Sequence, residues 1–178
     1  MAINKKIEEA LNEQINAEMY SAYLYLSMGS WFEEKSLTGF AHWFRCQYLE
    51  ENMHAMKMYN YVNERGGRVV LKPIEGPETE WKTYLDVFQQ VAEHEAHVTS
   101  LINNLVALSR EANDFASESF LMWYVDEQVE EEATADELVS KLKLIGDNPN
   151  ALLMMDTELG ARGASPNVIP IHLNEPVA

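Results

Sequence analysis

The positions of proline place the strongest constraint on how this chain can fold. The 178-residue sequence contains six prolines, and none of them lies between Met1 and Lys72 or between Glu78 and Asp147. Because proline breaks the interior of an α-helix, these two long gaps permit long helices. We therefore expect helices over most of the chain.

Local capping patterns divide the two gaps into four long helices, and a short fifth helix follows. Ser36 and Asp114 are the expected N-caps at which each gap is interrupted. Residues 66–77 hold three glycines and two prolines, which predicts a long crossover. The run Gly-Asp-Asn-Pro at residues 146–149 combines a helix stop with a helix start, for which Asn148 is the expected N-cap. The expected helices span residues 4–34, 37–65, 83–111, 114–145 and 149–161, and an irregular tail follows over residues 162–178.

The lengths of the connections predict an all-α fold. Short turns within the first and the second helix pair, together with the long crossover between the pairs, are typical of two antiparallel hairpins in one four-helix bundle. We expect a single domain over residues 1–178, with the bundle at 4–145. The short helix at 149–161 is apolar and is expected to pack at a symmetry axis between subunits. The one indication of a strand is the segment 68–71 in the crossover.

Charge and composition exclude several classes of function. Twenty-nine acidic residues against 13 basic ones give a net charge of −16, which argues against nucleic acid or anionic membrane as a partner and suits a protein that gathers cations. One cysteine, Cys46, rules out an intrachain disulfide framework and a thiolate zinc cluster. No apolar stretch approaches the roughly 20 residues of a membrane span, and the first residues lack the apolar segment of a signal peptide. We therefore expect a cytoplasmic protein.

Glutamate interrupts the apolar stripe of every long helix. Each stripe repeats at alternating three- and four-residue steps, which marks a buried face. The interrupting residues lie near the middle of each helix and would face one common core: Glu18, Glu51, Glu95 and Glu131. An uncompensated buried carboxylate costs several kcal/mol, and no Lys or Arg lies on the stripes. If only one helix carried such a glutamate, a solvent-exposed face would explain it. For glutamates on all four helices, two divalent cations would balance their four negative charges.

The residue types indicate which metal would bind. Carboxylates with one imidazole form a hard site that suits iron or manganese. Glu51 and His54 are three residues apart, so both reach the same side of their helix. This Glu-x-x-His motif, usual in two helices of carboxylate-bridged dimetal bundles, occurs once here, so the two metals would be bound unequally. We expect the first metal among Glu18, Glu51 and His54, and the second among Glu51, Glu95 and Glu131, with Glu51 bridging and Gln128 close to the second.

Four segments carry a resemblance to a known family: residues 12–25, 50–54, 93–95 and 123–132. Together they resemble the non-haem ferritins of the bacterial and archaeal type, and the similarity extends over about residues 4–160. The resemblance implies a ferritin-like bundle that assembles into a hollow shell of 24 subunits. It also implies that Fe(II) is oxidised by O₂ or H₂O₂ at a dinuclear ferroxidase centre and stored as a ferric oxyhydroxide mineral.

The same resemblance implies roles for individual residues. Glu18, Glu51 and His54 match the first iron site, and Glu51, Glu95 and Glu131 match the second, with Gln128 beside it. Tyr25 matches the tyrosine next to the centre, a one-electron donor, although a plain core aromatic would also occupy this position. Glu50, Glu127 and Glu130 match a third, inner iron site of bacterial ferritins, although a solvated acidic face would explain them equally well. Bacterioferritins bind haem through a methionine where this chain has Asn52, so no haem is expected.

Two other functions remain open from the residues alone. One is a di-iron or di-manganese oxidase, or a peroxide-detoxifying enzyme, without mineral storage; the other is a metal-free structural bundle. The missing second Glu-x-x-His and the lack of room for a substrate domain disfavour the first. His94 and His97, which are spaced almost like a zinc-protease motif, are expected to form a surface pair.

Overall fold

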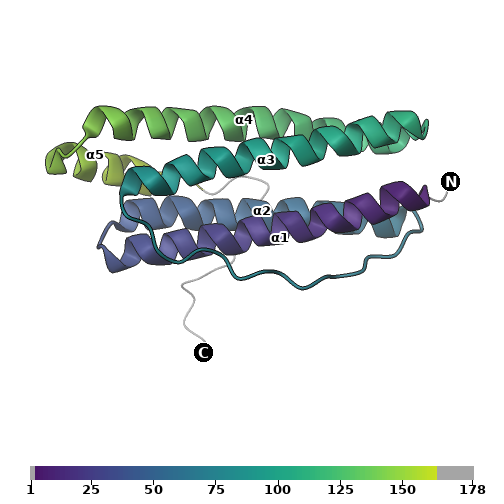
Figure 1. The fold of residues 1–178 in the computed structure, drawn as a ribbon, viewed down its shortest axis with the longest axis horizontal. Coiled ribbons are helices and arrows are strands. Elements are labelled where there is room, and N and C mark those ends of the chain that lie inside the picture. Colours follow the sequence, from purple (N-terminus) through teal and green to yellow (C-terminus); the bar gives the residue numbers. More distant parts are fainter. Residues whose placement is uncertain (1–2, 164–178) are drawn as a thin grey trace.

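The computed structural model describes residues 3–163, which form a four-helix bundle with a short fifth helix (Figure 1). The helices are α1 (Lys5–Glu34), α2 (Thr38–Glu64), α3 (Tyr84–Glu111), α4 (Phe115–Ile145) and α5 (Pro149–Gly160). The predicted fold class is confirmed, and every predicted helix end lies within one residue of the observed one. Of the predicted tail, residues 164–178 lie outside the described residues. No helix within residues 3–163 is both long and apolar enough to cross a membrane.

The crossover between α2 and α3 runs along the length of α1 (Figure 1). The side chain of Asn12 holds it there: Asn12 Nδ2 donates to the carbonyl of Arg68 at 3.1 Å, and Asn12 Oδ1 accepts from the backbone N–H of Val70 at 2.7 Å. The suggestion of a strand at residues 68–71 was wrong, because this backbone bonds to a side chain of α1 and no strand occurs in the described part of the chain. The crossover thus closes over the hairpin formed by α1 and α2.

Capping side chains begin two of the helices where the sequence predicted them. Asp114 accepts from the backbone N–H of Ser117 at 3.1 Å, and Asn148 accepts from the backbone N–H of Asn150 at 3.1 Å. The predicted cap at Ser36 was wrong: Leu37 occupies the N-cap position of α2 without a side-chain bond. Ser36 instead adopts a φ of 59°, because the tight turn from α1 to α2 needs one left-handed residue.

The core consists of two apolar clusters with a polar band between them. One cluster lies at the end of the bundle that carries α5 and includes Phe32, Phe40, Phe44 and Phe88, and Phe32 and Phe40 stack with ring centroids 4.9 Å apart. The second cluster fills the opposite end with aliphatic side chains such as Ile7. Each of the four long helices places buried polar residues between the two clusters in sequence: Glu18 and Ser21 on α1, Gln47, Glu51 and His54 on α2, Glu95 on α3, and Gln128 on α4.

Helix α5 docks onto the first turn of α2 through Asp156. Its Oδ1 accepts from the backbone N–H groups of Gly39 at 2.8 Å and Phe40 at 3.0 Å, and so supplies the cap that Leu37 cannot. A Cβ atom at Gly39 would lie 1.7 Å from the carbonyl oxygen of Asp156, so only glycine permits this approach. The docking fixes the path of the chain that leaves α5.

Candidate metal centre

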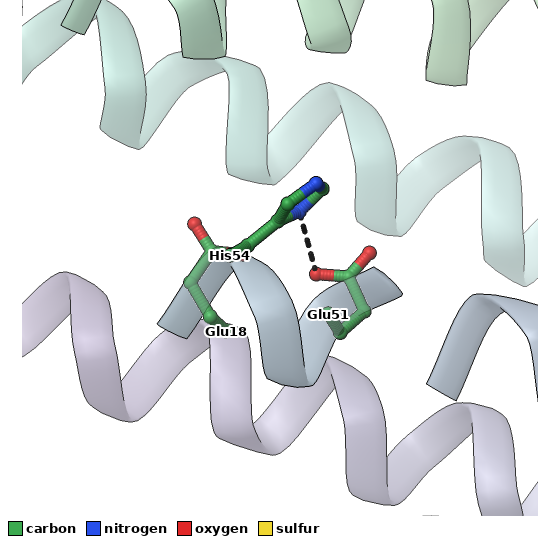
Figure 2. Close-up of side chains that lie close together, drawn as sticks. All are labelled: Glu18, Glu51 and His54. Carbon is green, nitrogen blue, oxygen red and sulfur yellow. Dashed lines mark ion pairs between the residues drawn. The ribbon is translucent and has the colours of Figure 1, made fainter. Parts of the chain in front are cut away.

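Three side chains from α1 and α2 converge in the polar band. One potential ligand atom from each of Glu18, Glu51 and His54 lies within 4.8 Å of the other two (Figure 2). His54 Nδ1 is 3.5 Å from Glu51 Oε2, and all three residues are 3% exposed or less. Glu18 Oε2 and His54 Nε2 have no hydrogen-bond partner although both are buried. Within residues 3–163 no other three Asp, Glu, His or Cys side chains gather this closely, so these are the predicted site residues that the structure brings together.

The other two residues of the predicted second site lie against protein donors. Glu95 is buried; its Oε1 accepts from the hydroxyl of Tyr25, and its Oε2 accepts from Gln128 Nε2 at 3.1 Å. Glu131 on α4 is partly buried, and its Oε2 accepts from Gln47 Nε2 at 2.9 Å. Tyr25 and Gln128 therefore both contact Glu95, and their roles at the centre remain predictions. The roles of Glu95 and Glu131 as ligands remain predictions.

The three residues of the predicted inner site are less closely grouped. Glu50 is buried on α2, and its Oε2 accepts from Arg162 Nη2 at 2.7 Å. Glu127 is partly exposed, with Oε2 4.0 Å from His54 Nε2, and Glu130 is exposed. A third iron site at these carboxylates also remains a prediction.

Burial and mutual repulsion favour protons on the acidic side chains. Burial raises the pKa of Glu18 well above its usual range, and the charge of Glu51 raises it further. Burial also raises the pKa of Glu51, and Glu95 and Glu131 add to this effect. For Glu131, burial and the charge of Glu95 raise the pKa to about 7. A bound cation would compete with these protons, so its affinity is expected to increase with pH.

Burial also governs the hydroxyl of Tyr25. It raises the pKa of this phenol well above its usual value, and the nearby charges of Glu95 and Glu51 act in the same direction. Tyr25 therefore stays protonated, and its hydroxyl donates a hydrogen bond to Glu95 Oε1.

Sequence reasoning missed several side chains that shape the centre. Gln14 donates to Glu18 Oε1 at 3.0 Å, as Gln47 does to Glu131. In the sequence, Gln14 precedes Glu18 by four residues and Gln47 precedes Glu51 by four residues. This spacing places each glutamine on the buried face of its helix and could have identified it. His94 was expected at the surface, but its Nε2 lies 2.7 Å from Ser21 Oγ and its ring packs edge-on to Tyr25, with centroids 6.0 Å apart. His97 is exposed as expected.

Comparisons with known proteins agree on one family. The sequence model of the ferritin-like domain, in the ferritin family, matches residues 8–145. A bacterial non-haem ferritin from Bacteroides fragilis is 45% identical over 160 residues, which cover 90% of this chain and 99% of that protein. One from Staphylococcus aureus is 38% identical over 160 residues, with coverage of 90% and 96%.

Solved structures show the same relationship in three dimensions. A crystal structure described as an open-pore ferritin from the archaeon Archaeoglobus fulgidus is similar to this chain with a TM-score of 0.90. It is 54% identical in sequence, and the match covers 91% of this chain and all of that one. The helices, the buried carboxylate and histidine side chains and these similarities lead to one conclusion: the chain belongs to the ferritin family.

Proposed function

We propose that this protein is an iron-storage ferritin. Each subunit binds two Fe(II) ions at a dinuclear ferroxidase centre and oxidises them with O₂ or H₂O₂. The Fe(III) is stored as a ferric oxyhydroxide mineral inside a hollow shell of 24 subunits. Membership of the ferritin family and relatives that carry the name non-haem ferritin support this proposal.

The observation that carries the proposal is the buried group of Glu18, Glu51 and His54. Two of its polar atoms, Glu18 Oε2 and His54 Nε2, have no hydrogen-bond partner, and no Lys or Arg within residues 3–163 forms an ion pair with the three residues. Unpaired buried polar atoms are costly. Two carboxylates and an imidazole that converge in this way suit a hard divalent cation such as Fe(II).

The second Fe(II) is assigned to Glu51, Glu95 and Glu131, with Glu51 shared between the two ions. Glu95 and Glu131 would exchange their bonds to Tyr25 and Gln47 for the ion, and Gln128 stays beside it. Each carboxylate that binds iron releases the proton that burial favours on it. Two cations would thereby neutralise the acidic band that the sequence places between the apolar clusters.

The oxidation is balanced by the two iron ions. Each Fe(II) loses one electron, and one O₂ takes up two electrons and two protons to give H₂O₂; with H₂O₂ as the oxidant the product is two water molecules. Hydrolysis of each Fe(III) to FeO(OH) then releases three protons. Tyr25, with its hydroxyl on Glu95, is placed to supply one electron when an oxidant is only partly reduced. Glu50, Glu127 and Glu130 would accept iron on its way to the mineral.

The test is aerobic oxidation of Fe(II) by the metal-free protein. We expect an amber solution without precipitate, dense cores in electron micrographs, and a particle of about 490 kDa for 24 subunits of 20.4 kDa. Replacement Glu51→Gln should lower the initial rate at least about tenfold, since it removes the bridging ligand. The exposed Glu93→Gln on α3 is the matched control. Oxidation that stops after two Fe(II) per subunit without cores would instead support an oxidase that does not store mineral.

A further inference from the structure

Arg162, two residues beyond the end of α5, is the one Lys or Arg of the described chain that forms an ion pair with any of the proposed iron residues. Its Nη2 donates to Glu50 Oε2 at 2.7 Å. The side chain of Arg162 is 27% exposed and that of Glu50 is 11% exposed. Attraction between two charges is stronger in such a partly shielded position than at the open surface. The chain as a whole carries a net charge of −16, so a basic side chain paired with an acidic residue of the proposed site stands against the overall charge of the chain.

Contacts from α2 hold Arg162 in place on several sides. Its carbonyl accepts from His42 Nε2 at 2.8 Å, and its guanidinium carbon lies 5.3 Å from the centre of the Trp43 ring. Its Nη1 donates to Gln47 Oε1. The bonds from Gly39 and Phe40 to Asp156 fix the helix that delivers it. Arg162 is therefore anchored to α2 before any ion binds.

The contact with Gln47 leaves the charge of Arg162 to Glu50. Because Gln47 is neutral, it satisfies one guanidinium nitrogen without neutralising it. The same contact orients the amide, so that Gln47 Nε2 faces the opposite way and donates to Glu131 at 2.9 Å. The full positive charge of Arg162 therefore acts on Glu50, the one residue of the predicted inner site that lies on α2.

We propose that Arg162 is a tethered counter-cation that competes with a third metal ion for Glu50. The inference rests on the proposed iron function, since the third ion would bind Glu50 together with Glu127 and Glu130. An ion that arrives at Glu50 must displace the guanidinium or share the carboxylate with a like charge. The third ion is therefore bound more weakly than the first two, which suits an ion in transit to a mineral.

The experiment is an anaerobic titration of the metal-free assembled protein with Co(II), followed by calorimetry and by the visible absorption of the bound ion. Wild type is expected to bind two equivalents per subunit tightly and a third weakly. Replacement Arg162→Gln should tighten the third equivalent by about tenfold, in the range expected for removal of one partly shielded like charge. Arg162→Lys keeps the charge and should remain close to wild type. Arg45→Gln on α2, which breaks an exposed pair with Glu33 of α1, is the control.

Three results would overturn the inference: a third equivalent that is unchanged in Arg162→Gln, one that tightens equally in Arg162→Lys, or no third equivalent in any of the proteins. Failure of the proposed function looks different, because wild type would then not bind the first two equivalents, and the Arg162 inference would fall with it. Gel filtration of each variant verifies that its assembly matches that of wild type.

Discussion

Replacing Glu131 by glutamine is expected to stabilise the metal-free protein in alkaline solution and to leave its stability nearly unchanged in acid. Burial and the charge of Glu95 raise the pKa of Glu131 from 4.5 to about 7. Glutamine has almost the same shape and cannot ionise. Its amide oxygen can accept the bond that Gln47 Nε2 now donates at 2.9 Å. The replacement therefore removes the cost of ionisation and keeps the local contact.

The size of the effect follows from the two pKa values. One pKa unit corresponds to 1.36 kcal/mol, so a rise from 4.5 to about 7 is worth about 3 kcal/mol. Below pH 4.5 the carboxyl is protonated in both the folded and the unfolded chain, and no cost exists. Between pH 4.5 and about 7 the folded protein retains a proton that the unfolded chain releases, so the stability of wild type falls as the pH rises. Above about pH 7 the full cost is present.

Urea unfolding of the metal-free proteins at about pH 5 and pH 8 measures this difference, at one fixed protein concentration because the subunits assemble. Glu131→Gln should exceed wild type by about 3 kcal/mol at the higher pH and by about 0.8 kcal/mol at the lower pH. The exposed Glu93→Gln on α3 is the control. An equal gain at both pH values, or a loss at the higher pH, would refute the assignment of an ionisation cost to Glu131.

Three further replacements test other parts of the structure. Burial raises the pKa of Glu95, and the hydrogen bond from Tyr25 opposes this rise. Tyr25→Phe removes that bond, so more protons should be released per bound Zn(II), measured by calorimetry in buffers of different ionisation enthalpy. Asp156→Ala removes both bonds to the start of α2 and should cost about 1–2 kcal/mol in unfolding; unchanged stability would contradict the docking of α5. Asp114→Ala removes the cap of α4 and two bonds of 2.9 and 3.1 Å from Arg65, and should cost about 2 kcal/mol in thermal unfolding.

Much of the fold could be predicted because local chemistry decides where the helices end. Proline at position 149 and the capping side chains of Asp114 and Asn148 act within a few residues of their own positions in the chain. The inward direction of Glu18 and Glu51 could also be predicted, since helical spacing alone fixes the face on which a residue lies. Such features require no knowledge of the partner helix.

Features that depend on contacts between distant segments could not be predicted. Serine is a preferred N-cap residue, so the sequence predicted a cap at Ser36. The turn into α2 instead needs a left-handed residue at that position. Arg162 lies in no recognisable pattern, and it reaches Glu50 only because α5 docks beside Gly39. Glu131 shares its stripe with buried residues and yet remains partly exposed, because its depth depends on how the neighbouring helices pack.

The division of the core explains how the bundle tolerates an acidic centre. Phe32, Phe40 and Phe88 pack together at one end, and aliphatic side chains fill the other. Both clusters involve all four long helices, so either end can hold the helices in register. The carboxylates between them raise one another's pKa values and oppose folding when they ionise. Stability located at the two ends therefore allows the middle of the bundle to keep carboxylates that lower the stability of the metal-free protein.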